Sequence, residues 1–141
     1  MILAVDASVA VKWFLAHSGQ DDHTEQALEI LARAAQGDIQ LVQPPHFMAE
    51  VSAVLARLKP ADALDDLADL LQIAQRRAEG PEIYAAAIEL SVRHGSHLFD
   101  TLYHAVALHT RDAALVTADR KYFTKASAEG SIAWLGDFTF A

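Results

Sequence analysis

The sequence predicts an α/β fold of three layers, in which helices cover both faces of a short, mostly parallel central sheet. Short apolar runs typical of buried strands occur at 2–5, 39–42, 114–117 and 132–135, and helical segments separate them. Strands that alternate with helices along one chain usually form a parallel sheet with helices on both faces. The 141 residues contain no linker, repeat or low-complexity segment, so we expect a single domain over 1–141.

Apolar periodicity, together with the positions of proline and glycine, predicts the helices. They are expected at 7–16, from Asp21 or Asp22 to about 36, and at 46–59, 61–77, 83–94, 99–110 and 121–128. The first is almost entirely apolar, so we expect it to be largely buried, and Trp13 and Trp134 are assigned to the core or an interface. In the helix over 61–77, Leu64, Leu67, Leu70 and Leu71 form the apolar side, and the aspartates between 62 and 69 should face solvent.

Composition limits the classes of protein to which the chain can belong. No stretch approaches the roughly 18 apolar residues that cross a bilayer, so we expect no membrane span. No basic segment precedes the first apolar run, so we expect no signal peptide and a cytoplasmic location. The lack of cysteine excludes disulfides and thiolate metal sites. The net charge of −8 is opposite to the basic surplus typical of nucleic-acid binders. That objection weakens if grouped acids hold divalent cations, or if a basic partner is present.

Three aspartates lie where an open α/β sheet places its ligands. Asp6 follows the first strand, Asp119 follows the strand over 114–117, and Asp100 lies in the first turn of the helix over 99–110. Each has an ordinary structural alternative, because an aspartate at these positions also caps a helix or complements its dipole.

Glu50 is the more diagnostic acid, because it lies beside the apolar stripe of its helix. A carboxylate there is costly to bury unless something compensates its charge. A position at the rim of the core, or pairing with Arg57 or Lys59, would also explain it. Carboxylates that converge repel one another unless a cation lies between them, and hard divalent ions prefer oxygen ligands. Together the four acids therefore indicate a site for a hard divalent cation.

Four segments resemble the PIN-domain proteins of the VapC toxin type. They are VDASVAVKWF (5–14), PHFMAEV (45–51), LFDTLYHAVAL (98–108) and LVTADRK (115–121). They occur in the family's order and at its usual separations, and the resemblance extends from residue 2 to about 135. The region 72–84 resembles the family least, which leaves a third strand there undecided. Phe99 departs from the family, in which a tyrosine commonly precedes the third acid, and we expect this to affect packing more than chemistry.

The resemblance implies an endoribonuclease toxin of a toxin–antitoxin pair, with Mg²⁺ or Mn²⁺ as its cofactor. By position, Asp6, Glu50, Asp100 and Asp119 match the family's acidic quartet, both as catalytic residues and as metal ligands. Ser8 and Thr117 match polar positions that assist it. The products would carry 5′-phosphate and 3′-hydroxyl ends. Implied partners are an RNA substrate, a small DNA-binding antitoxin and a second copy of the chain in a homodimer.

Several alternatives remain open at this stage. The fold could serve as a catalytically silent binding module or as a structure-selective DNA nuclease, whereas a small-molecule enzyme lacks the usual glycine-rich phosphate loop. Lys12 could meet a phosphate of the substrate or be a structural lysine whose stem is buried. The histidine pairs 94/97 and 104/109 lack the spacing of a helical zinc site. His104 is expected to be exposed and paired with Asp100.

Overall fold

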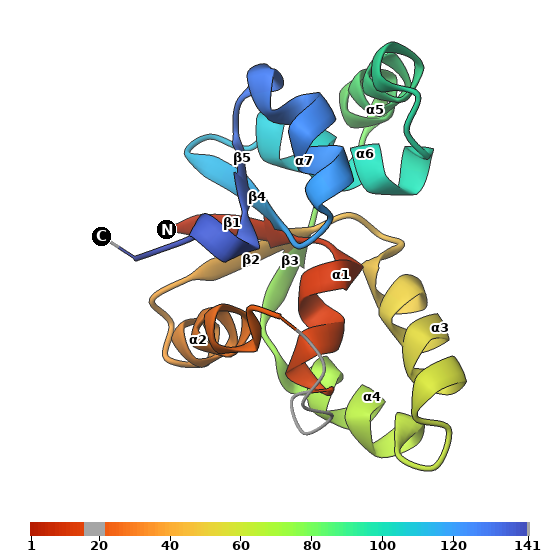
Figure 1. Cartoon of the computed structure of the whole chain (residues 1–141), viewed down its shortest axis with the longest axis vertical. Helices are drawn as coiled ribbons and strands as arrows, with labels where there is room; N and C mark the ends of the chain where they lie inside the picture. The colour runs from red at the N-terminus through yellow and green to blue at the C-terminus, as the bar shows by residue number, and fades with distance from the viewer. Residues whose placement is uncertain (16–21, 141) are drawn as a thin grey trace.

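The computed structural model describes residues 1–15 and 22–140 and contains a five-stranded parallel sheet in the order β3-β2-β1-β4-β5 (Figure 1). The strands are β1 Ile2–Val5, β2 Gln40–Gln43, β3 Gln75–Arg77, β4 Ala113–Thr117 and β5 Ile132–Trp134. β1 is central and pairs with β2 on one side and β4 on the other. This arrangement confirms the predicted fold class, with a sheet that is parallel throughout the described residues.

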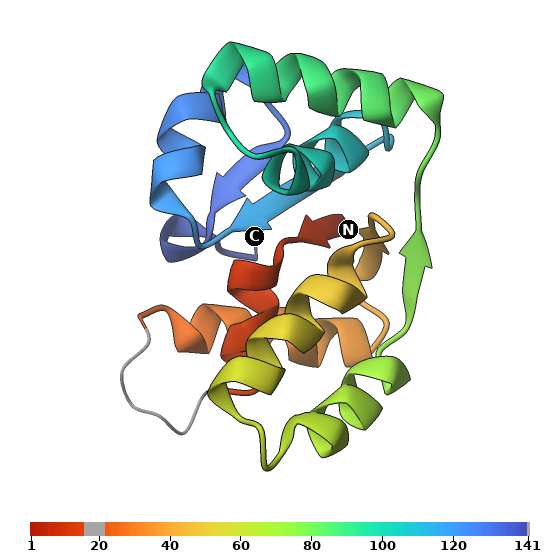
Figure 2. The same cartoon turned by 90° about the vertical axis from the view of Figure 1, so that its right-hand side faces the viewer.

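The helices form two layers, one on each face of the sheet. They are α1 Ala7–Ala10, α2 Thr24–Ala35, α3 Phe47–Leu58, α4 Ala63–Gln72, α5 Pro81–His94, α6 Leu98–Leu108 and α7 Arg120–Ala126, with a 3₁₀ turn η1 Val11–Trp13 after α1. Helices α1 to α4 cover one face, and α5 to α7 cover the other (Figures 1 and 2). Among the described residues, none of these helices is both long and apolar enough to span a bilayer.

The first helical region is shorter than its apolar sequence predicts. Helix α1 gives way at Val11 to the 3₁₀ turn that ends at Trp13, and residue 16 lies outside the described residues. The residue before α2 is His23, in the left-handed conformation, so Asp22 is not the cap of that helix. Asp21, the other predicted cap, lies outside the described residues.

The single helix predicted over 61–77 is wrong. Helix α4 ends at Gln72, Ile73 is extended, and β3 follows, paired in parallel with β2. Hydrogen bonding to β2 overrides local helical propensity here, since a weak intrinsic preference yields readily to tertiary pairing. The apolar side of α4 is also smaller than predicted. Leu70 is buried, but Leu64 and Leu71 are 82% and 64% exposed.

The aspartates of this region are not uniformly solvated either. Asp66 forms an ion pair with Lys59, with 2.8 Å between Oδ2 and Nζ. Lys59 also donates to the carbonyl of Phe14 at 2.8 Å. The connection between α3 and α4 is therefore tied to the end of η1 by one lysine.

The two tryptophans differ in their surroundings. Trp13 belongs to the core, is 7% exposed, and donates from Nε1 to the carbonyl of Ala27 at 2.9 Å. Trp134 is only partly buried, and the guanidinium of Arg120 lies 4.1 Å from its ring centroid. The expectation of a core or interface position is thus confirmed for Trp13.

The prediction that His104 is exposed and paired with Asp100 is wrong. His104 is fully buried, and its two ring nitrogens lie 2.8 Å from the hydroxyl of Tyr122 and 2.8 Å from the carbonyl of Gly130. Because a carbonyl only accepts, Nε2 carries the proton and Nδ1 accepts from Tyr122. Burial lowers the pKa of His104, although the bond to Gly130 opposes this effect, so the neutral ring ties α6 to α7 and to the loop before β5.

Replacing His104 with leucine should lower the free energy of unfolding by about 3 kcal/mol, because the buried hydroxyl of Tyr122 and the carbonyl of Gly130 would lose their partner. The difference in stability between the wild type and His104→Leu should also narrow as the pH falls below 6.5, since the unfolded wild-type chain takes up a proton at His104 there and the folded chain resists it. Urea unfolding at pH 7.5 and 5.5 measures both effects. Tyr122→Phe, which removes one of the two bonds, should cost about 1 kcal/mol. Equal losses in the two variants would contradict the assignment.

Candidate active site

Both helical layers deliver acidic side chains to the carboxyl ends of β1 and β4. Asp6 follows β1 and precedes α1, and Glu50 lies in the first turn of α3. From the other layer, Asp100 lies in the first turn of α6, and Asp119 precedes α7. All four line a cavity of about 90 Å³, together with Ser8 and Tyr103. The structure therefore brings together the four acids that the sequence analysis singled out.

Asp6 is held by two hydroxyl groups. Ser8 donates to Oδ1 and Thr117 donates to Oδ2, and Asp6 is 9% exposed. Burial raises the pKa of Asp6 to about 6, with a contribution from the charge of Asp100, although the two hydroxyl bonds oppose the rise. Asp6 is the N-cap residue of α1, as the structural alternative expected, although its side chain makes no capping hydrogen bond to the helix.

Ser8 and Thr117 also join the ends of β1 and β4. The Ser8 hydroxyl accepts from the backbone N–H of Ala118 at 3.1 Å, and the Thr117 hydroxyl accepts from the N–H of Asp119 at 3.0 Å. Asp119 accepts in turn from the N–H of Tyr122 at 3.0 Å, which confirms its predicted helix-cap role. Each hydroxyl thus fixes the Asp6 carboxylate relative to the loop that carries Asp119.

Glu50 is compensated by neighbours that the sequence analysis did not identify. Tyr103 donates to Glu50 Oε1 at 2.7 Å across the two helical layers, and Nε2 of His46 lies 3.2 Å from the same oxygen. Burial raises the pKa of Glu50, but these hydrogen bonds and the histidine charges outweigh it, so the pKa is lowered. Pairing of Glu50 with Lys59 is wrong, since Lys59 binds Asp66, and no ion pair with Arg57 occurs among the described residues.

Asp100 carries the least compensated charge of the cavity. Its carboxylate is partly buried and forms no side-chain hydrogen bond among the described residues. Burial raises its pKa, the charges of Glu50 and Asp119 raise it further, and His97 and His46 reduce the effect. Like charges held in one cavity favour either protonation of a carboxyl group or a bound cation.

The chemistry of the donor set fits a hard divalent cation. Four carboxylates supply only oxygen ligands, which Mg²⁺ and Mn²⁺ prefer, and a cation that lies between them offsets their mutual repulsion. Among residues 1–15 and 22–140, no three acidic or histidine side chains are arranged to hold a metal ion as they stand. Asp100 has the freedom to turn inward, because no hydrogen bond restrains its carboxylate in the described structure.

Two positioning residues, His46 and Tyr103, were missed from the sequence. His46 precedes Glu50 by four residues, the spacing that places two side chains on one face of a helix, and this signal was available. Tyr103 lies 53 residues from Glu50, and only the docking of α6 against α3 brings them together. The backbone carbonyl of Phe99, 2.9 Å from His46 Nε2, adds a second contact between the layers.

Tyr103→Phe should raise the pKa of Glu50 and lower the free energy of unfolding by about 1 kcal/mol, because Glu50 would lose a hydrogen bond at 2.7 Å. Chemical denaturation measures the stability, and the pH dependence of the difference between variant and wild type reports the Glu50 pKa. Tyr84→Phe is a suitable control, since Tyr84 donates to exposed Glu79 on the surface. An unchanged stability in Tyr103→Phe would contradict the role assigned to the bond.

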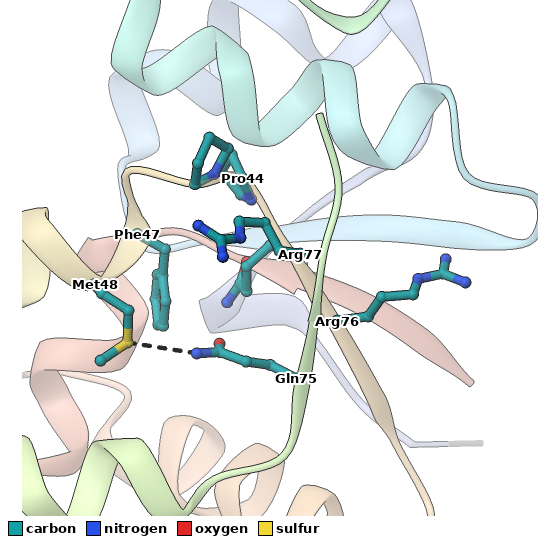
Figure 3. A pocket seen from close by; sticks show the side chains of 8 residues that line it. Pro44, Phe47, Met48, Gln75, Arg76 and Arg77 are labelled. Atoms are coloured by element: carbon teal, nitrogen blue, oxygen red, sulfur yellow. Dashed lines mark hydrogen bonds between the residues drawn. The ribbon is translucent and has the colours of Figure 1, made fainter. Parts of the chain in front are cut away.

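A larger cavity, of about 310 Å³, lies at the edge of the sheet between β2, β3 and the start of α3 (Figure 3). Met48 and Gln75 face each other across it, with Nε2 of Gln75 3.4 Å from the Met48 sulfur, while Arg76 points away (Figure 3). None of its lining residues is acidic, so it offers no carboxylate to a cation. The carboxylate cavity, although smaller, is the better candidate for chemistry.

The histidines do not form a zinc site among the described residues. His94 lies 2.9 Å from Glu129, which also binds Arg93, and His97 accepts the backbone N–H of Phe99 at 3.1 Å as the cap of α6. Phe99 itself is 47% exposed and contributes little to the core side of its helix.

Comparison with known proteins agrees with the fold. The PIN domain family matches residues 3–129, and curated protein sequences give no match. A Mycobacterium tuberculosis structure described as VapC20, a sarcin–ricin loop cleaving toxin, superposes with a TM-score of 0.64 at 20% identity, covering 92% of this chain and 95% of that chain.

Two toxin–antitoxin structures have the same fold. VapBC2 from Rickettsia felis, bound to a DNA fragment from its promoter, gives a TM-score of 0.64 at 16% identity, covering 95% of this chain and 98% of that chain. VapBC-1 from nontypeable Haemophilus influenzae gives 0.61 at 15% identity, covering 95% and 96%. Since the family match extends over most of the 141 residues, the chain belongs to the PIN domain family.

Proposed function

We propose that this PIN domain is a metal-dependent endoribonuclease and the toxin of a toxin–antitoxin pair. The observation that carries the proposal is the convergence of Asp6, Glu50, Asp100 and Asp119 on one cavity at the ends of β1 and β4. The raised pKa values of Asp6 and Asp100 support a cation there, because a positive charge would stabilise both carboxylates. The fold shared with a toxin described as cleaving the sarcin–ricin loop supports RNA as the substrate.

In this proposal Asp6 and Asp100 ligate the cation directly, and Glu50 and Asp119 ligate it or orient bound waters. Ser8 and Thr117 fix the rotamer of Asp6, and Tyr103 and His46 do the same for Glu50. A bound Mg²⁺ or Mn²⁺ supplies an activated water and offsets the charge on the leaving oxygen. Because water attacks the phosphorus rather than the RNA 2′-hydroxyl, the products are a 5′-phosphate and a 3′-hydroxyl.

The proposed partners are a small DNA-binding antitoxin and a second copy of the chain, acting in the cytoplasm. Two of the similar structures are described as complexes of VapB with VapC. A basic residue of the antitoxin would find four carboxylates in the cavity, and the net charge of −8 favours a basic partner in general.

The test is cleavage of total RNA by the purified protein with Mg²⁺, with Mn²⁺ and with EDTA. Discrete cuts with 5′-phosphate ends, absent in EDTA, are expected. A parallel reaction on branched and flapped DNA separates the ribonuclease from a structure-selective DNA nuclease, since cutting of DNA alone would replace the proposal. Absence of cutting of either substrate by folded, antitoxin-free protein would favour a silent binding module.

A further inference from the structure

Two groups of basic side chains line cavities that adjoin the carboxylate cavity. One neighbouring cavity, of about 370 Å³, includes Ser8 of the carboxylate cavity and is also lined by Lys12 and Arg57. Another, of about 180 Å³, includes Asp100 and Asp119 and is also lined by Lys121 and Lys125. Because each of these cavities shares lining residues with the carboxylate cavity, the three lie next to one another, and we call them together the groove. The carboxylate cavity supplies its acids, and the two neighbouring cavities supply its cations.

No acid neutralises these four cations, whereas three others in the chain are paired at short distance. Arg33, Lys59 and Arg93 each form an ion pair with a carboxylate at 3.2 Å or less. Within the described part of the chain, none of the four groove cations forms an ion pair or hydrogen bond. In a protein with 19 acidic and 11 basic residues, four unpaired cations beside one cavity leave positive charge available to an external anion.

The two groups come from different layers of the fold. Lys12 belongs to η1 and Arg57 to α3, in the layer that supplies Asp6 and Glu50. Lys121 and Lys125 lie four residues apart on α7, so they share one face of the helix, in the layer that supplies Asp100 and Asp119. The groove thus crosses the boundary between the layers, with the four carboxylates at its midpoint.

We propose that this groove binds a single strand of RNA, which runs from Lys12 and Arg57 across the carboxylates to Lys121 and Lys125. The phosphate to be cut lies at the carboxylates, and phosphates on either side contact the two basic groups. The inference rests on the proposed function and adds the path of the substrate. A single strand fits because the central cavity measures only about 90 Å³ and lies between two helical layers, whereas a duplex keeps its backbone on a wide convex surface.

The arrangement explains how an acidic protein can hold a polyanion. Four carboxylates repel any approaching phosphate, and a cation at the centre removes only part of that repulsion. Basic groups that contact the neighbouring phosphates release counterions and make binding favourable at both ends of the groove. The net charge of the chain is therefore a poor guide to whether it binds RNA, since the sign of the local charge changes along the groove.

The test measures the affinity of single-stranded RNA by fluorescence anisotropy at several salt concentrations, with Mg²⁺ and in an Asp100→Asn background that prevents cleavage. Lys12→Ala with Arg57→Ala, and separately Lys121→Ala with Lys125→Ala, should each reduce the slope of log affinity against log salt by about 1.4, which corresponds to two lost phosphate contacts on a single strand. Arg76→Ala with Arg77→Ala is the matched control. It removes two unpaired cations of β3 outside the groove and should leave the slope unchanged.

Thermal unfolding confirms that each variant is folded before its slope is compared. The proposed path is wrong if both groove variants have the same slope as the Asp100→Asn protein in which they are made. It is also wrong if the control variant shows an equal decrease, or if the Asp100→Asn protein does not bind RNA. Cleavage by the wild-type protein decides the proposed function separately. If the wild type cuts RNA but the slopes are unchanged, the ribonuclease activity stands and the RNA path along the groove is wrong. If the slopes fall but no RNA is cut, the path stands and the proposed activity is wrong.

Discussion

Asp100→Asn is expected to abolish RNA cleavage while leaving the protein at least as stable as the wild type. Loss of a group that merely supports a metal ligand commonly costs 10- to 100-fold in activity, so loss of a proposed ligand should cost at least about 100-fold. Stability should not fall, because ionised Asp100 is destabilised by burial and by the charges of Glu50 and Asp119, and asparagine removes that charge without changing the shape. Cleavage rates in Mn²⁺ and a melting curve in EDTA measure the two effects.

The matched control is Asp65→Asn, which removes an exposed carboxylate of α4 far from the cavity. It should cut RNA at the wild-type rate and melt at the wild-type temperature. Full activity in Asp100→Asn would show that Asp100 is not a ligand of the catalytic cation. A lower melting temperature of Asp100→Asn in EDTA would show instead that its carboxylate stabilises the fold.

In EDTA, the stability of the wild-type protein relative to Asp6→Asn should fall as the pH rises from 4 to 7. The pKa of Asp6 is 3.8 in its ordinary state and about 6 in the folded protein, so the protonated form is favoured by folding. The contribution of Asp6 to the free energy of unfolding is fully present below pH 3.8 and is lost as the pH rises through about 6. The difference amounts to about 3 kcal/mol at neutral pH, or roughly 10 °C in melting temperature.

Melting temperatures of both proteins across this pH range, with and without Mn²⁺, test this prediction. Comparison of the two removes the pH dependence that other groups contribute equally. Mn²⁺ should restore the wild-type melting temperature at pH 7, because a cation bound to ionised Asp6 reverses the cost of ionisation, and it should have little effect on Asp6→Asn. Parallel curves for the two proteins in EDTA would contradict the raised pKa.

The positions of the acids were predictable because they follow from the ends of strands and helices. Apolar runs locate β1 and β4, and Asp6 and Asp119 follow these runs directly. β3 was not predictable in the same way. It consists of Gln75, Arg76 and Arg77, polar residues with no strand periodicity, and it forms because the exposed edge of β2 offers a partner.

The environment of each acid could not be inferred from the sequence. Tyr103 reaches Glu50 and Thr117 reaches Asp6 only when α6, β4 and β1 are packed together. His104 illustrates the opposite error, because its position one turn after Asp100 indicated a local pair, whereas it turns away toward Tyr122 and Gly130. Spacing along a helix gives the neighbours on one face, and the packing of other elements decides which contacts are made.

The order of the strands has a consequence for the synthesis of the protein on the ribosome. β1 emerges first, but one of its two neighbours in the sheet, β4, is made more than one hundred residues later, and Asp119 follows β4. A nascent chain that extends only through α5 holds two of the four acids and has an open edge on its central strand. The carboxylate site therefore cannot assemble until α6, β4 and Asp119 have been synthesised and packed against β1.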